Sequence, residues 1–132
     1  IKELKNIKVK FKHINFKNYD ELIKLYKCLN VYLVSSREEG GPRAILESFA
    51  SKTPLVTTNV GQAVDIVENN FNAFKSNNIN EEELANYIYN KIYNKSDNLD
   101  KILNNGYQTA ENNSYDKQIN LWRDFFNLYD SK

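Results

Sequence analysis

The chain has 132 residues, a length that suits one domain with its own core, and its 18 basic and 17 acidic residues leave a net charge of +1. This balance argues against nucleic-acid binding, and we expect no nucleic-acid partner. A single cysteine excludes an internal disulfide framework and indicates a cytoplasmic setting, and every apolar run is too short to cross a membrane.

The first predicted element is a strand over residues 7–12, where apolar residues alternate with lysines. One face of this strand would be exposed to solvent, as expected of an edge strand that lysines protect from aggregation. The same lysine row would also suit contact with the anionic inner face of a membrane. Its members are Lys8, Lys10 and Lys12. His13, the only histidine, belongs to no recognisable triad, and we expect it at the surface or in a structural role.

The next elements alternate between helix and strand. Residues 18–30 have acids early, lysines late and apolar side chains at helical spacing, namely Leu22, Leu25, Tyr26 and Leu29. Cys28 is expected to be buried in that helix. The runs at 31–36 and 54–58 are rich in β-formers without alternation, which favours strands buried on both faces of a parallel sheet. A glycine turn and a short helix follow, in which Asp65 and Glu68 are expected to be solvated. Residues 72–76 are predicted to form a short further strand.

The remaining chain is helical by its apolar spacing. One helix carries Leu84, Ile88 and Ile92, and a middle segment covers roughly 96–112. The last segment has an apolar stripe that we expect to be core packing, with Tyr115, Ile119, Trp122, Phe126 and Tyr129. The order of elements predicts an α/β fold with a parallel sheet and flanking helices. Residues 1–76 would form the α/β core and 77–132 a helical C-terminal segment.

The loop after the strand at 31–36 reads Glu-Glu-Gly-Gly-Pro-Arg over residues 38–43. In parallel sheets, ligands bind beyond the carboxyl ends of the strands, where this loop lies. Pro42 suits the first helical position, and Gly40 and Gly41 let the backbone bend and approach a ligand closely. The N–H groups at the start of the next helix then form a ready anion site.

Charged side chains in this stretch are candidates for ligand contacts. Arg43 in a first helical turn opposes the helix dipole at a cost of roughly 0.3–1 kcal/mol, which a bound anion could offset. A salt bridge from Arg43 to Glu47 or Glu39 explains it equally well. Glu39 and Glu47 can both face one pocket, where carboxylates accept hydrogen bonds from adjacent sugar hydroxyls. Glu38 has no role beyond that of a solvated acid.

The residues "EGGPRAILE" at 39–47 resemble the E-x7-E motif of GT-B glycosyltransferases, in particular family 4 (GT4), the glycosyl transferases group 1. Residues 20–75 are similar over their whole length, because helix, strand, E-x7-E helix, Thr-Pro strand and Val-Gly turn follow in the family's order. The helical remainder is similar more loosely. The motif alone would be a weak signal, but this context makes it specific.

The resemblance implies a Rossmann-like fold, the C-terminal, donor-binding half of a two-domain GT-B enzyme. Such an enzyme transfers a sugar from a donor such as a UDP- or GDP-sugar to an acceptor, with retained configuration and without a metal or other cofactor. Glu39 would be the catalytic residue at the donor sugar, and Glu47 would bind the ribose hydroxyls. The other donor-binding positions would be Gly40, Gly41, Pro42, Arg43, Ala44, Val60 and Gly61, with Gln62 in the same turn.

Departures from the family matter as well. The Arg and Lys that hold the pyrophosphate have no match before residue 20, and the acceptor domain, towards which the family's last helix crosses back, is absent. With no methionine and Ile1 at its start, the chain is expected to be a truncated half-domain, inactive alone, that lacks two strands beside residues 7–12. A non-catalytic nucleotide-sugar-binding or regulatory module with the same fold stays an alternative. A dinucleotide-binding oxidoreductase is less favoured, because no G-x-G-x-x-G follows a strand.

Overall fold

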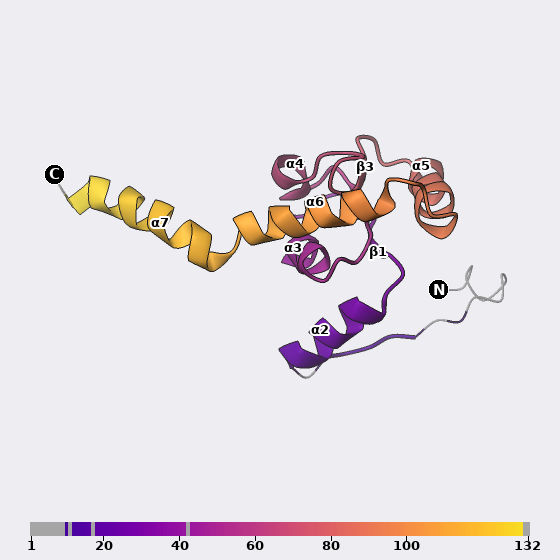
Figure 1. Ribbon diagram of the computed structural model, residues 1–132, viewed down its shortest axis with the longest axis horizontal. Helices are drawn as coiled ribbons and strands as arrows, with labels where there is room; N and C mark the ends of the chain where they lie inside the picture. The colour runs from indigo at the N-terminus through magenta and orange to yellow at the C-terminus, as the bar shows by residue number, and fades with distance from the viewer. Residues whose placement is uncertain (1–9, 11, 17, 42, 131–132) are drawn as a thin grey trace.

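The structure, a computed structural model, describes all of the chain except residues 1–9, 11, 17, 42 and 131–132. Its elements are α2 (Tyr19–Cys28), β1 (Tyr32–Val34), α3 (Arg43–Ala50), β2 (Leu55–Thr58), α4 (Ala63–Ile66), β3 (Phe74–Ser76), α5 (Glu81–Asn86), η1 (Tyr87–Tyr93), α6 (Leu99–Asn112) and α7 (Tyr115–Asp130). Parallel strands with helices around them confirm the predicted α/β class and its helical C-terminal segment (Figure 1). The strand predicted at 7–12 lies outside the described residues, apart from Lys10 and Lys12.

The sheet has the order β1-β2-β3, so β2 is its central strand. All four residues of β2 are buried, as its uninterrupted β-prone sequence predicts. β1 differs from its prediction, because Leu33 is 45 % exposed and only Val34 is buried. Among the described residues β1 has a strand on one side only, and helices cover such an edge less completely than the centre of a sheet.

The two faces of β2 build two separate core clusters, because successive side chains of a strand point to opposite faces. Leu55 belongs to the first cluster, together with Val34, Ile45, Phe49, Val60, Ala63, Val67 and Ala73. Val56 belongs to the second, together with Phe74, Leu84, Ile92, Leu99 and Ile102. Each fully buried large side chain contributes about 1.5–3 kcal/mol. The segment from α5 to α6 is therefore part of the core.

Helix α2 forms where the sequence predicts it. The side chain of Asn18 caps its start, and Oδ1 accepts the N–H of Glu21 at 3.0 Å. Tyr26 faces inward and is 3 % exposed, whereas Cys28 is exposed and the predicted burial is wrong. Two residues after Tyr26, Cys28 points about 200° away around the helix. Thr53 Oγ1 donates to the Tyr26 carbonyl at 2.7 Å and fastens the end of α2.

Helix α3 packs against β2 and against α6, which crosses it (Figure 1). It buries Ile45, Ser48 and Phe49, whereas Ala50 is exposed. The two helices approach closely at Gly106 of α6. A Cβ there would lie 3.0 Å from the Phe49 ring and 3.0 Å from the carbonyl oxygen of Asn72.

The helix predicted around residues 84–92 forms as α5 and continues as the π-helical segment η1. Asn80 caps α5, since its Oδ1 accepts the backbone N–H groups of Glu82 and Glu83. Within the described part of the chain, no helix combines the length and the apolar character needed to cross a membrane.

Helix α7 extends away from the rest of the molecule as an arm (Figure 1). Three residues of its predicted stripe, Tyr115, Trp122 and Phe126, are exposed rather than packed in the core, and the prediction for them is wrong. Tyr115 is 77 % exposed, Trp122 56 % and Phe126 59 %. The rings of Trp122 and Phe126 stack on each other with centroids 6.2 Å apart. Because α7 projects beyond the sheet, the stripe has no core to join.

Candidate functional site

The loop after β1 forms a groove at the carboxyl edge of the sheet. The groove has a volume of about 380 Å³ and is lined by β1, the loop and the first turn of α3. Its polar residues include Ser35, Ser36, Glu39 and Arg43, and Gly41 and Ala44 also line it. Thr58 Oγ1, at the end of buried β2, donates to the Ser36 carbonyl at 2.7 Å. The central strand therefore holds the base of this loop in place.

Gly40 and Gly41 leave the space beside the loop open. A Cβ added at either position would meet no atom within 4 Å, and neither backbone is in the left-handed region. Packing within the described part of the chain therefore does not require glycine at these positions, and close approach of a ligand is a role that glycine would still serve. Pro42 lies outside the described residues, and α3 begins at Arg43.

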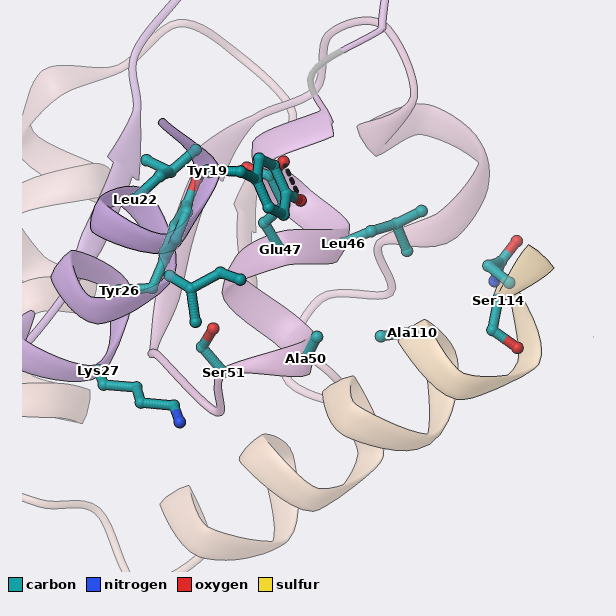
Figure 2. Close-up of a pocket in the computed structure, with 12 residues that line it drawn as sticks. Tyr19, Leu22, Tyr26, Lys27, Leu46, Glu47, Ala50, Ser51, Ala110 and Ser114 are labelled. Carbon is teal, nitrogen blue, oxygen red and sulfur yellow. Dashed lines mark hydrogen bonds between the residues drawn. The ribbon is translucent and has the colours of Figure 1, made fainter. Parts of the chain in front are cut away.

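Glu47 lies in the second turn of α3 and turns towards α2. Tyr19 Oη donates to its Oε1 at 2.9 Å and Tyr26 Oη donates to its Oε2 at 3.1 Å (Figure 2). The carboxylate lines a second hollow of about 380 Å³ between α2, α3 and the end of α6. Apolar side chains such as Leu22 and Leu46 form much of its wall. Glu47 is thus a single acid, paired with two hydroxyls, in a largely apolar hollow.

Both tyrosines hold their protons more tightly than a free side chain does. The pKa of Tyr19 is raised mainly by its hydrogen bond to Glu47, and burial and the negative charge of Glu47 raise it further. The Arg43 cation lowers this pKa and so opposes the shift. Burial is the main cause that raises the pKa of Tyr26, and Tyr32 and Glu47 add to it. The two hydroxyls therefore stay neutral hydrogen-bond donors at ordinary pH.

The structure separates the two glutamates that the sequence placed in one pocket. Glu39 lines the groove, whereas Glu47 lines the hollow beside α2. Arg43 lies with Glu39 in the groove, and its charge also reaches Tyr19 beside Glu47. The cause is local geometry: Glu39 sits in the loop, where helix periodicity does not set its direction, while Glu47 follows the side of α3 that faces α2.

The turn after β2 lies at the same edge of the parallel sheet as the groove. Val60 is 8 % exposed and packs in the first core cluster, so only its backbone could meet a ligand. Gly61 has a φ of 49°, a left-handed conformation that strongly favours glycine. Asp65 and Glu68 are exposed, as predicted. His13 is exposed as well, and its Nε2 lies 2.9 Å from Asn15 Oδ1.

The hydrogen bonds from the Tyr19 and Tyr26 hydroxyls to Glu47 were not predicted from the sequence. Sequence reasoning treated Tyr26 as an apolar position of its helix and gave Tyr19 no role. A spacing of seven residues places both phenols on one face of α2, and that is the signal available in the sequence. Their partner Glu47 lies 28 and 21 residues further along the chain, so the contact itself was not predictable. Among the described residues, no three His, Cys, Asp or Glu side chains cluster as metal ligands would.

Comparison with known proteins identifies a family and several similar proteins, of which two are described here. The sequence model described as "Glycosyl transferases group 1" matches residues 1–109. The capsular polysaccharide biosynthesis glycosyltransferase CapM of Staphylococcus aureus is 28 % identical over 115 residues, which is 87 % of this chain and 30 % of CapM. The crystal structure of a glycosyltransferase from Rickettsia africae ESF-5 aligns with a TM-score of 0.73 and 26 % identity, over 98 % of this chain and 34 % of that one. The chain spans about a third of the length of these relatives.

Proposed function

The chain belongs to the glycosyl transferases group 1, and we propose that the complete protein transfers a sugar from a nucleotide-sugar donor to an acceptor. In this proposal residues 1–76 form the donor-binding core and 77–132 its helical support. The observation that carries the proposal is the polar groove at the carboxyl edge of β1, where Glu39, Arg43 and the start of α3 meet. In parallel α/β sheets, this edge is where ligands bind.

The charges of the groove suit a diphosphate donor such as a UDP- or GDP-sugar. Arg43 and the N–H groups of the first turn of α3 offer positive charge and hydrogen-bond donors to phosphate oxygens. These groups could neutralise the leaving diphosphate without a metal ion, which supports metal-independent transfer. Retention of configuration and transfer of a hexose rest on the resemblance of residues 39–47 to the E-x7-E motif.

One extended donor can reach both hollows. Arg43 in the groove and Glu47 beside α2 are one helical turn apart, or about 6 Å along the axis. The sugar and phosphates would then occupy the groove, with Glu39 at the sugar, and the ribose hydroxyls would meet Glu47. The open space beside Gly40 and Gly41 leaves room for the backbone of the loop to approach the donor.

The acceptor follows less directly from the chain. CapM is named for capsular polysaccharide biosynthesis, and we propose a growing glycan as the acceptor, bound by an acceptor domain of the complete protein. Such an assembly would work in the cytoplasm at the inner face of the membrane, where the predicted lysine row of residues 8–12 could contact anionic lipid.

The substitution Glu39→Gln tests the catalytic assignment. We expect turnover of the donor to fall at least about tenfold, because a hydrogen bond that acts at the reacting sugar is lost. The affinity for UDP or GDP should change less than about twofold, because the nucleotide is held elsewhere. The measurements are release of nucleoside diphosphate from a panel of UDP- and GDP-hexoses and calorimetric binding, both on the complete protein.

The matched control is Glu38→Gln, which removes the neighbouring exposed acid and should leave both quantities unchanged. Wild-type turnover in Glu39→Gln would contradict the catalytic role. Donor binding by the unmodified protein without any transfer or hydrolysis would favour a non-catalytic nucleotide-sugar-binding module instead.

A further inference from the structure

We propose that Tyr19 and Tyr26 are positioning residues that hold the Glu47 carboxylate in the orientation that accepts two ribose hydroxyls. The inference rests on the proposed function and deepens it, because it gives helix α2 a part in the nucleotide site. Each tyrosine donates to a different carboxylate oxygen, at 2.9 Å and 3.1 Å. Two side chains of α2 therefore fix the orientation of the carboxylate plane.

The hydrogen-bonding capacity of Glu47 matches this role. A carboxylate offers about four lone-pair sites on its two oxygens. The tyrosines use one site on each oxygen, which leaves one further site on each. Two adjacent hydroxyls of a ribose present two donors at a spacing that suits two oxygens of one carboxylate. The pairing thus leaves the number and arrangement of acceptors that a vicinal diol needs.

The two donors differ in how firmly they are held. Tyr26 is 3 % exposed, its ring packs on Tyr32 with centroids 5.3 Å apart, and its carbonyl is bonded to Thr53. Tyr19 is 59 % exposed and lies in the first turn of α2. Tyr26 is therefore the fixed donor and Tyr19 the donor at the rim. A carboxylate that is already oriented loses less conformational freedom when the ligand binds.

The competing explanation is that these bonds only fasten α2 to α3. The chain contains a pair of the same kind elsewhere, since Tyr87 Oη donates to Glu83 Oε1 at 2.9 Å. That pair lies in α5 and η1, away from both hollows of the site. Tyr87→Phe is therefore a matched control that removes a tyrosine–glutamate bond without touching Glu47.

The experiment compares ligands with and without the ribose hydroxyls. Binding of UDP and GDP and of their 2′,3′-dideoxy forms is measured by calorimetry on the complete protein and on its Tyr19→Phe and Tyr26→Phe variants. We expect each variant to bind the ribose ligand about 3- to 10-fold more weakly, because a carboxylate that is no longer held in place loses more conformational freedom when the ligand binds. Binding of the dideoxy ligand should not change, and Tyr87→Phe should bind both ligands as the unmodified protein does.

The outcomes separate this proposal from the proposed function. Equal losses for both ligands would overturn it in favour of a structural role, and tighter binding would show that the hydroxyls compete with the ribose.

Tyr19 is exposed, so Tyr19→Phe keeps the test valid if Tyr26→Phe fails to fold. Glu47→Gln should weaken only the ribose ligand, and Tyr26→Phe should add nothing in that background. If Glu47→Gln acts and neither tyrosine variant does, only the positioning proposal fails. If Glu47→Gln has no effect, or neither nucleotide binds, the nucleotide assignment of Glu47 fails with it.

Discussion

Tyr26 keeps its proton at pH values where a free tyrosine loses it. The free energy of unfolding therefore depends on pH through the Tyr26 hydroxyl. Its pKa is raised from 10.0, mainly by burial and further by Tyr32 and Glu47. Above about pH 10 the unfolded chain loses this proton while the folded chain retains it, so stability falls as pH rises. We expect Tyr26→Phe to lose less stability than the unmodified chain between about pH 9 and 11, a difference of up to about 1.4 kcal/mol per pH unit.

Urea unfolding followed by circular dichroism across this pH range measures the effect. Tyr93→Phe controls for the removal of one phenol hydroxyl, because Tyr93 is 76 % exposed. Identical profiles for the Tyr26→Phe and unmodified chains would show that the phenol is ionised as easily in the folded as in the unfolded state.

At the residue scale, periodicity predicted which positions face inward only in part. It placed Tyr26 on the inner face of α2 but also Cys28, although the two point in different directions from one helix. It identified the groove residues Glu39 and Arg43 by their type and context, but not the separation of Glu39 from Glu47. Loop direction and contacts across 20 or more residues depend on the assembled fold, which local patterns do not encode.

At the scale of elements, the crossing of α3 and α6 depends on one glycine. A Cβ at Gly106 would lie 3.0 Å from the Asn72 carbonyl oxygen and 3.0 Å from the Phe49 ring. Alanine improves a helix by about 0.5–1 kcal/mol, but overpacking costs about 1–3 kcal/mol, and the backbone oxygen cannot yield easily. We therefore expect Gly106→Ala to lower the free energy of unfolding by about 1 kcal/mol, measured by urea titration.

Gln108→Ala supplies the control, because Gln108 is an exposed residue of the same helix, and it should change stability by less than about 0.5 kcal/mol. A Gly106→Ala variant more stable than the unmodified chain would mean that the helices separate readily at this crossing. The Asn72 side chain, which donates to Thr109 Oγ1 at 3.1 Å, would then be expected to adjust as well.

Most elements could be predicted because their signals are local. The uninterrupted run at 54–58 indicated a central strand, and the Asn caps at residues 18 and 80 lie where α2 and α5 begin. The failures concern what covers an element. Leu33 of β1 and the α7 residues Trp122 and Phe126 are apolar, but each stays largely exposed in the described part of the structure. An apolar pattern indicates that one face of an element favours burial, but it does not indicate which other element covers that face.

At the scale of the whole molecule, the arm formed by α7 leaves a run of large apolar side chains in water. The exposed members of the stripe include Tyr115, Trp122 and Phe126. A contiguous exposed patch of this kind is unusual for a surface that has no partner. Since the chain spans about a third of the length of its relatives, we propose that the acceptor domain of the complete protein covers this stripe.

If so, the stripe should contribute little to the folding of the chain itself. Trp122 is 56 % exposed and packs only on rings of its own helix in the described contacts, with Phe125 and Phe126 at 6.3 Å and 6.2 Å. We expect Trp122→Ala to change the free energy of unfolding of the 132-residue chain by less than about 1 kcal/mol, whereas Phe49→Ala should cost about 3–5 kcal/mol. Urea unfolding measures both, and the single tryptophan allows iodide quenching of the unmodified chain as a second test. Strong quenching in the folded chain is expected.

A cost for Trp122→Ala close to that for Phe49→Ala, with a shielded indole, would show that α7 folds back on its own domain and has no free face for an acceptor domain.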